Sequence, residues 1–170
     1  MRLFLAVELP EELKDLLYEN YKELSKLKGI KAIDPKKSHL TLAFIGETHP
    51  EKVKKFLSKF KFNSFKVSID GYGFFPNIET PRVAWLRVKE NENLHALSEK
   101  LSPLKKDSKK FIPHVAVARI KKQNKSVEKI LEENKVKYEF KVTYITLFKS
   151  QLTPMGPIHT VIERYKAQDL

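Results

Sequence analysis

The chain interleaves short strand-like segments with amphipathic helical segments in an irregular order, and this pattern most constrains its fold. Residues 2–8, 39–45 and 65–75 have the apolar or alternating composition of strands, whereas the segments that start at Pro10 and Pro50 carry apolar residues at helical spacing. Several strands follow one another as hairpin-like pairs. The pattern therefore predicts an α+β fold with largely antiparallel sheets rather than a doubly wound parallel sheet. The other predicted segments are strands at 30–33, 83–88, 114–120, 137–148 and 158–165, and helices at 92–102 and 126–134.

Composition narrows the class of protein. With 170 residues the chain has the length of one domain, and it contains no cysteine, which excludes disulfides, thiolate metal sites and a cysteine nucleophile. No apolar run approaches the ~20 residues of a membrane span, and the first residues lack the features of a signal peptide. The net charge of +12 indicates a polyanionic partner such as nucleic acid. We therefore expect a cytoplasmic, basic protein.

Most of the basic residues are lysines, which are also typical of a solvated or heat-adapted surface. One segment differs, because residues 105–125 hold eight basic residues and a single acid, Asp107. This segment includes His114. The local charge asymmetry suggests that an anion binds near that histidine.

Two predicted strands, one in each half of the chain, begin with histidine. The segment from residue 38 to 44 reads SHLTLAF, and the segment from 113 to 119 reads PHVAVAR, so that His39 and His114 lie 75 residues apart. Since alternate strand residues share a face, His39 and Thr41 point one way, as do His114 and Ala116. This is a weak internal duplication.

Two such strands brought together would place two imidazoles across one cleft. Near pH 7, one neutral and one protonated histidine could act as base and acid when water attacks a phosphate ester, and no metal would be required. Alternatively, the two histidines are structural, and the residues alone leave both interpretations open. A metal site is poorly supported because no carboxylates and histidines occur at ligand spacing, and the Gly-x-Ser-x-Gly pattern of a serine nucleophile is absent.

The two His-x-Thr-type strands resemble the 2H phosphoesterase superfamily. More narrowly, the chain is similar to the bacterial and archaeal RNA 2′,3′-cyclic phosphodiesterases, also called 2′-5′ RNA ligases. The similarity covers nearly the whole chain, and it implies a single bilobal domain over residues 1–170, with pseudo-twofold symmetry and a central groove. The segments that carry the resemblance are RLFLAV (2–7), PKKSHLTLAFIG (35–46), GFFPN (73–77), PRVAWL (81–86), FIPH (111–114) and SQLTPMGP (150–157).

The resemblance also implies the role of each site residue. His39 corresponds to the general acid on the leaving 3′ oxygen, and His114 to the general base on water. Thr41 and Arg119 correspond to phosphate-binding residues, and Phe44 to an aromatic near the base or phosphate. The implied enzyme needs no metal or cofactor and acts as a cytoplasmic monomer on RNA with a 2′,3′-cyclic phosphate end, with tRNA fragments among the candidates.

Three features of the chain bear on this comparison. Ala116 stands where the family has Thr or Ser, so one phosphate donor is missing, which also favours a weakly active or non-catalytic RNA-end binder; 2′-5′ RNA ligation is a third alternative. Phe44 and Arg119 lie five residues after their histidines, so strict alternation would turn them to the opposite face unless each strand ends or bulges there. His159, where the family usually carries Tyr, is a secondary candidate for the groove.

Overall fold

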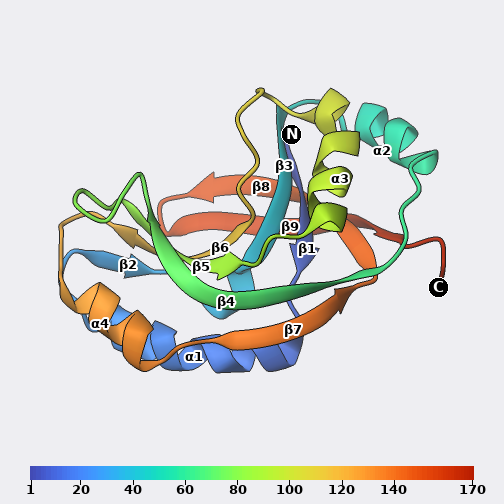
Figure 1. Ribbon diagram of the computed structural model, residues 1–170. Helices are drawn as coiled ribbons and strands as arrows, with labels where there is room; N and C mark the ends of the chain where they lie inside the picture. Colours follow the sequence, from blue (N-terminus) through green and yellow to red (C-terminus); the bar gives the residue numbers. More distant parts are fainter.

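The computed structural model describes residues 1–170 and contains two antiparallel sheets (Figure 1). This confirms the predicted α+β class. The first sheet has four strands in the spatial order β3 (His39–Glu47), β1 (Arg2–Glu8), β8 (Tyr144–Thr153) and β9 (Gly156–Lys166). The second has five in the order β2 (Ile30–Ala32), β6 (His114–Ile120), β5 (Val83–Val88), β4 (Phe65–Phe75) and β7 (Lys137–Val142).

Four α-helices and two 3-10 turns connect the strands. Each α-helix begins with an acidic residue in its first turn, which complements the helix dipole. In Figure 1, α1 and α4 lie side by side on one side of the molecule, and α3 lies against β3. Their bounds are α1 Glu11–Ser25, α2 Pro50–Ser58, α3 Glu92–Lys100 and α4 Ser126–Glu133, and the 3-10 turns are η1 Pro35–Lys37 and η2 Ser102–Leu104.

The core takes one face of each sheet. Along β1, Leu3, Leu5 and Val7 are buried in the main hydrophobic cluster, together with Leu13 and Leu17 from α1. Phe4 and Ala6 point the other way and form a separate small cluster with the ring of Phe148. The second face of the first sheet therefore remains available for a site.

The predicted single strand at 137–148 was wrong. The chain leaves the second sheet after β7, which pairs with β4, and enters the first sheet as β8, which pairs with β1 and β9. The alternation of apolar residues continues through Thr143 without a Pro or Gly, so no local signal marks the break. Only the two different sets of pairing partners separate these strands.

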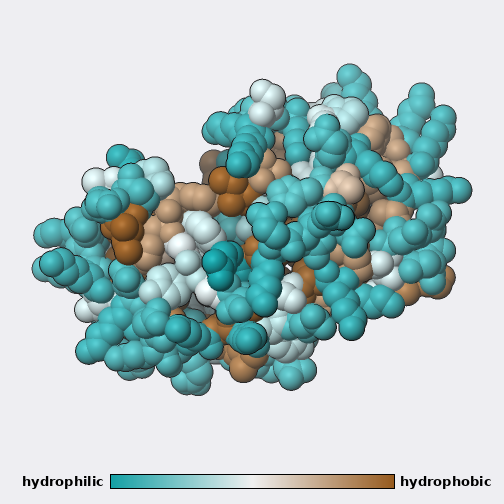
Figure 2. All heavy atoms as spheres, viewed as in Figure 1, coloured by the Kyte–Doolittle hydropathy of each residue, from teal (hydrophilic) through white to brown (hydrophobic).

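No helix of the structure is long and apolar enough to cross a membrane. Hydrophilic side chains cover most of the face seen in Figure 2, and hydrophobic ones appear there in scattered spots. This distribution agrees with the many lysines in the sequence.

Candidate active site

A bulge in β3 places Phe44 on the same face as His39. In the pairing with β1, Ala6 lies opposite Thr41 and Leu5 opposite Ala43, which leaves Leu42 as the extra residue. Leu42 and Ala43 are consequently both buried, and Phe44 is 62% exposed. The bulge reverses the alternation, so His39, Thr41 and Phe44 share the open face of the sheet.

A bulge at the equivalent place in β6 does the same for Arg119. Trp85 lies opposite Ala116 and Ala84 opposite Ala118, so that Val117 is the extra residue. Val117 and Ala118 are both buried, and Arg119 is exposed. His114, Ala116 and Arg119 therefore share a face, in a pattern that matches β3 residue by residue.

His39 lies in a cluster of four rings that spans the first sheet. Its ring centroid is 5.3 Å from that of Phe4, 5.0 Å from that of Phe148 and 5.0 Å from that of His159. Phe4 also stacks on Phe148 at 5.1 Å. The strands β1, β3, β8 and β9 each contribute one ring to this cluster.

This environment disfavours a charged imidazole. Burial, followed by the His159 imidazole and the Lys14 ammonium, lowers the pKa of His39 to about 4. Burial also lowers the pKa of His159, with Lys37 and Arg2 adding to the effect. Both histidines are therefore neutral at pH 7 in the free protein.

His114 is oriented by the main chain. Its Nδ1 lies 2.7 Å from the carbonyl oxygen of Ile112, which fixes the tautomer that carries its proton on Nδ1. The rings of Phe75 and Trp85 flank it, with centroids 4.9 Å and 6.0 Å away. The Nε2 lone pair of His114 is consequently free to accept a proton.

Thr41 and Arg119 have side chains without partners in the protein. Thr41 is partly exposed and its hydroxyl makes no hydrogen bond, and the Arg119 guanidinium forms neither a hydrogen bond nor an ion pair. On the groove face beside Arg119, Lys31 of β2 lies directly opposite in the register. These groups are available for an anion.

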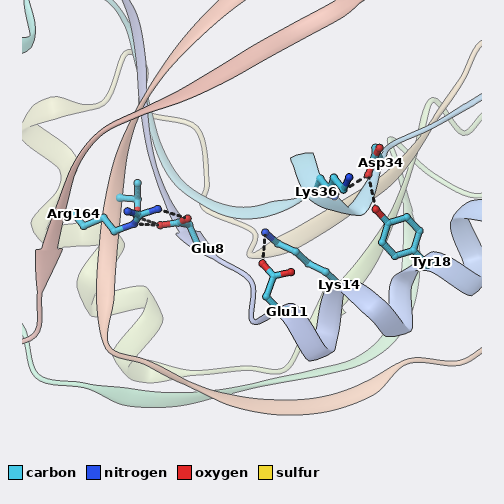
Figure 3. Close-up of polar contacts among 8 residues, drawn as sticks. Glu8, Glu11, Lys14, Tyr18, Asp34, Lys36 and Arg164 are labelled. Carbon is cyan, nitrogen blue, oxygen red and sulfur yellow. Dashed lines mark hydrogen bonds and ion pairs between the residues drawn. The ribbon is translucent and has the colours of Figure 1, made fainter.

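A carboxylate network adjoins His39. Glu8 is directly opposite His39 in the register, accepts hydrogen bonds from Arg164 Nε at 2.7 Å and Nη2 at 3.1 Å, and accepts another from Thr146 Oγ1 at 2.6 Å (Figure 3). The hydrogen bond from Arg164 lowers the pKa of Glu8, and the Thr146 hydroxyl contributes to the same effect. Glu8 is thus held ionised and fully engaged.

The two histidine-bearing strands approach each other where the sheets meet, since β3 contacts β6. The basic segment reinforces this junction, because the backbone N–H of Lys106 donates to the carbonyl oxygen of Phe44 at 2.8 Å. Lys105 turns inward, donates to Ser98 Oγ at 2.6 Å and lies over the ring of Phe111. Lys105 is therefore a structural anchor rather than part of a free basic surface.

Nothing in the side-chain chemistry of this region resembles a metal centre. No three His, Cys, Asp or Glu side chains lie close enough together to hold a metal ion. The groups around the two histidines are instead cations, a hydroxyl and aromatic rings, which suit an anionic organic ligand.

Comparison with known proteins identifies the family. Residues 7–85 match the model of the LigT-like phosphoesterases. A protein of Archaeoglobus fulgidus named RNA 2′,3′-cyclic phosphodiesterase is 38% identical over 169 residues, an alignment that covers 94% of this chain and 96% of that protein. A protein of Methanocaldococcus jannaschii with the same name is 35% identical and is covered over its whole length.

The chain belongs to the LigT-like phosphoesterase family. It is therefore a hydrolase of phosphate esters. The crystal structure of the protein TT0787 from Thermus thermophilus superposes with a TM-score of 0.82 at 30% identity and covers 99% of this chain and 98% of that one. The two antiparallel sheets described above are thus the fold of this family.

This LigT-like chain differs from the sequence expectation mainly in its ring cluster. His159, a secondary candidate from sequence, contacts both His39 and Phe4, whose ring lies 5.0 Å from that of His159. Phe148 and Glu8 complete the surroundings of His39 and were not among the candidates. No sequence motif signals their role, because β1, β8 and β9 become neighbours only through sheet pairing.

Proposed function

We propose that this protein hydrolyses the 2′,3′-cyclic phosphate ends of RNA to 2′-phosphates, with His39 as the general acid and His114 as the general base. The observation that carries the proposal is the matched pair of bulged strands, which present a histidine and an anion-binding or aromatic residue on one open face each. The names of the relatives from Archaeoglobus fulgidus and Methanocaldococcus jannaschii agree with this substrate.

His114 suits the role of base in the free protein. Its Nδ1 proton is committed to the Ile112 carbonyl, so Nε2 can take a proton from water as the water attacks phosphorus. The hydrogen bond also stabilises the imidazolium that forms in this step, because a carbonyl oxygen favours a charged donor.

His39 must gain a proton before it can act as an acid, since its pKa is about 4 in the free protein. A cyclic phosphate diester carries one negative charge. At a separation of ~4 Å and an effective dielectric constant of ~20, that charge stabilises an imidazolium by about 4 kcal/mol, or about three pKa units. Substrate binding thus brings the pKa of His39 near 7, and the proton is then delivered to the leaving 3′ oxygen.

Thr41 and Arg119 bind the non-bridging phosphate oxygens in this proposal. Arg119 offers a fork of donors and Thr41 one hydroxyl, and neither is engaged within the protein. Phe44 lies at the edge of the site, with its ring 6.3 Å from that of Phe4, and can contact a base or the phosphate. The acid, the base and these donors require no metal or cofactor.

A second candidate function is binding of RNA ends with little or no catalysis. It is favoured by Ala116, which lies on the same face as His114 and cannot donate to a phosphate oxygen. Ligation of 2′-5′ ends uses the same groups in the reverse direction. Activity assays with defined ends separate the three.

The test is incubation with an oligonucleotide that ends in a 2′,3′-cyclic phosphate, and with tRNA halves, followed by separation of the products. We expect a 2′-phosphate product, a bell-shaped pH dependence, no effect of EDTA, and a loss of at least ~100-fold in His39→Ala and His114→Ala. His49→Ala is the matched control, because His49 is exposed at the start of α2. Retained activity in either of the first two variants would refute the paired-histidine mechanism, whereas binding without turnover would favour the second function.

A further inference from the structure

A pocket adjoins His39 on the side of η1 and β9. Its volume is about 270 Å³, and His39 and His159 line it together. The chain segments around it come from both ends of the sequence, since it is bounded by α1, η1, β8 and β9. The remaining lining residues are Glu8, Lys14, Lys36, Lys37, Ser38, Phe148, Ile158 and Val161.

The pocket combines apolar and cationic walls. Phe148, Ile158 and Val161 form the apolar part on β8 and β9. Lys14, Lys36 and Lys37 provide three ammonium groups, and the one carboxylate, Glu8, is already neutralised by Arg164. An organic anion with an apolar body fits such walls, as a nucleotide does.

A local hydrogen-bond network places the lysines. The Asp34 carboxylate accepts the backbone N–H of Lys36 at 2.9 Å and the hydroxyl of Tyr18 at 3.3 Å, which ties η1 to α1. Figure 3 shows Lys14 rising from α1 toward the space between Glu8 and η1. Its ammonium lies 3.5 Å from the carboxylate of Glu11, but the Lys14 side chain is only 17% exposed, and it lines this pocket rather than extending into bulk solvent.

The chemistry of ring opening says which part of the substrate lies here. In an in-line displacement the attacking water and the leaving oxygen lie on opposite sides of phosphorus. The leaving 3′ oxygen stays attached to the ribose, so the nucleoside lies on the side of the acid, His39. The next phosphate of the RNA chain is joined to the 5′ oxygen of that same ribose.

We propose that this pocket binds the terminal nucleotide of the RNA and that Lys14 and Lys37 bind the phosphate on its 5′ side. The inference rests on the proposed function and extends it by naming a second phosphate subsite. The enzyme then distinguishes a nucleotide within an RNA chain from a free nucleoside cyclic phosphate. Its preference for RNA ends arises from this pocket as well as from the cyclic phosphate itself.

The test compares two substrates with the same base, adenosine 2′,3′-cyclic phosphate with a 5′-hydroxyl or with a 5′-phosphate. We expect kcat/KM to be about tenfold higher for the 5′-phosphorylated form, because two partly shielded charge-assisted contacts are added. In Lys14→Gln/Lys37→Gln this ratio falls to near 1. The control Lys52→Gln/Lys55→Gln, with the same charge change on α2 in a separate pocket, keeps the parent ratio.

A ratio within one protein is insensitive to partial misfolding, so a general loss of activity does not imitate the result. A parent ratio near 1, or a ratio that survives in Lys14→Gln/Lys37→Gln, would overturn the subsite while leaving the cyclic phosphodiesterase intact. If the parent consumes neither substrate, the proposed function fails instead. Calorimetric affinities for the same two nucleotides then give the ratio, with the same two outcomes for the pocket.

Discussion

Replacing His39 by phenylalanine should make the protein less sensitive to acid. The pKa of His39 is about 4 in the folded chain because burial in the cluster with Phe4, Phe148 and His159 disfavours the imidazolium. In the unfolded chain the same imidazole titrates near its ordinary value of about 6.5. The unfolded state therefore binds more protons between these two values, and acid shifts the equilibrium toward it.

The magnitude follows from the two pKa values. The stabilisation from a neutral His39 is complete above pH 6.5 and declines as the pH falls toward 4. With a folded pKa of about 4, about 2.5 kcal/mol of it is lost on going from pH 7.5 to pH 4.5. Phenylalanine has no such proton and occupies the same ring cluster, so His39→Phe should lack this part of the acid sensitivity.

Urea unfolding of the parent and of His39→Phe at both pH values measures the effect. The parent should lose about 2.5 kcal/mol more of its free energy of unfolding than the variant, and other acid-sensitive groups such as Glu8 cancel in the difference. His39→Leu should give the same difference, which guards against a defect peculiar to the larger ring. A difference below ~0.5 kcal/mol, or an NMR titration of His39 with its midpoint above pH 6, would refute the account of the cluster.

Three further predictions concern groups around the two histidines. A Cβ at Gly73 would lie 2.5 Å from ring atoms of Trp85, so Gly73→Ala should displace the only tryptophan, shift its fluorescence emission and cost about 1–3 kcal/mol of stability in urea unfolding; an unchanged emission spectrum would contradict the packing. Ala116→Thr adds a donor on the face of His114 and should lower KM for the cyclic phosphate about tenfold in steady-state assays, and an unchanged KM would mean that other donors already suffice. Glu8→Gln should lose about 1 kcal/mol of stability at pH 7, a modest value because Arg164 is half exposed, and since the pKa of Glu8 is lowered in the fold this loss should disappear as the pH falls below about 4, as urea unfolding at both pH values would show.

Much of the fold was predictable from local patterns. The helices after Pro10 and Pro50 begin where the proline and the first acidic residues place them, and the strands β3 and β6 begin at His39 and His114 as expected. These features depend on residues close together in sequence. The separation of β7 from β8 was not predictable, because it depends on which distant strands each segment pairs with.

The sequence by itself determined the two histidines, the α+β class and the family resemblance, since all of these are recorded in the order and spacing of residues. Only the tertiary structure decided on which face Phe44 and Arg119 lie, because a bulge is visible only as a mismatch with the partner strand. It also decided the protonation of His39. Burial is a property of the four strands that surround this imidazole, and no neighbour in the sequence reports it.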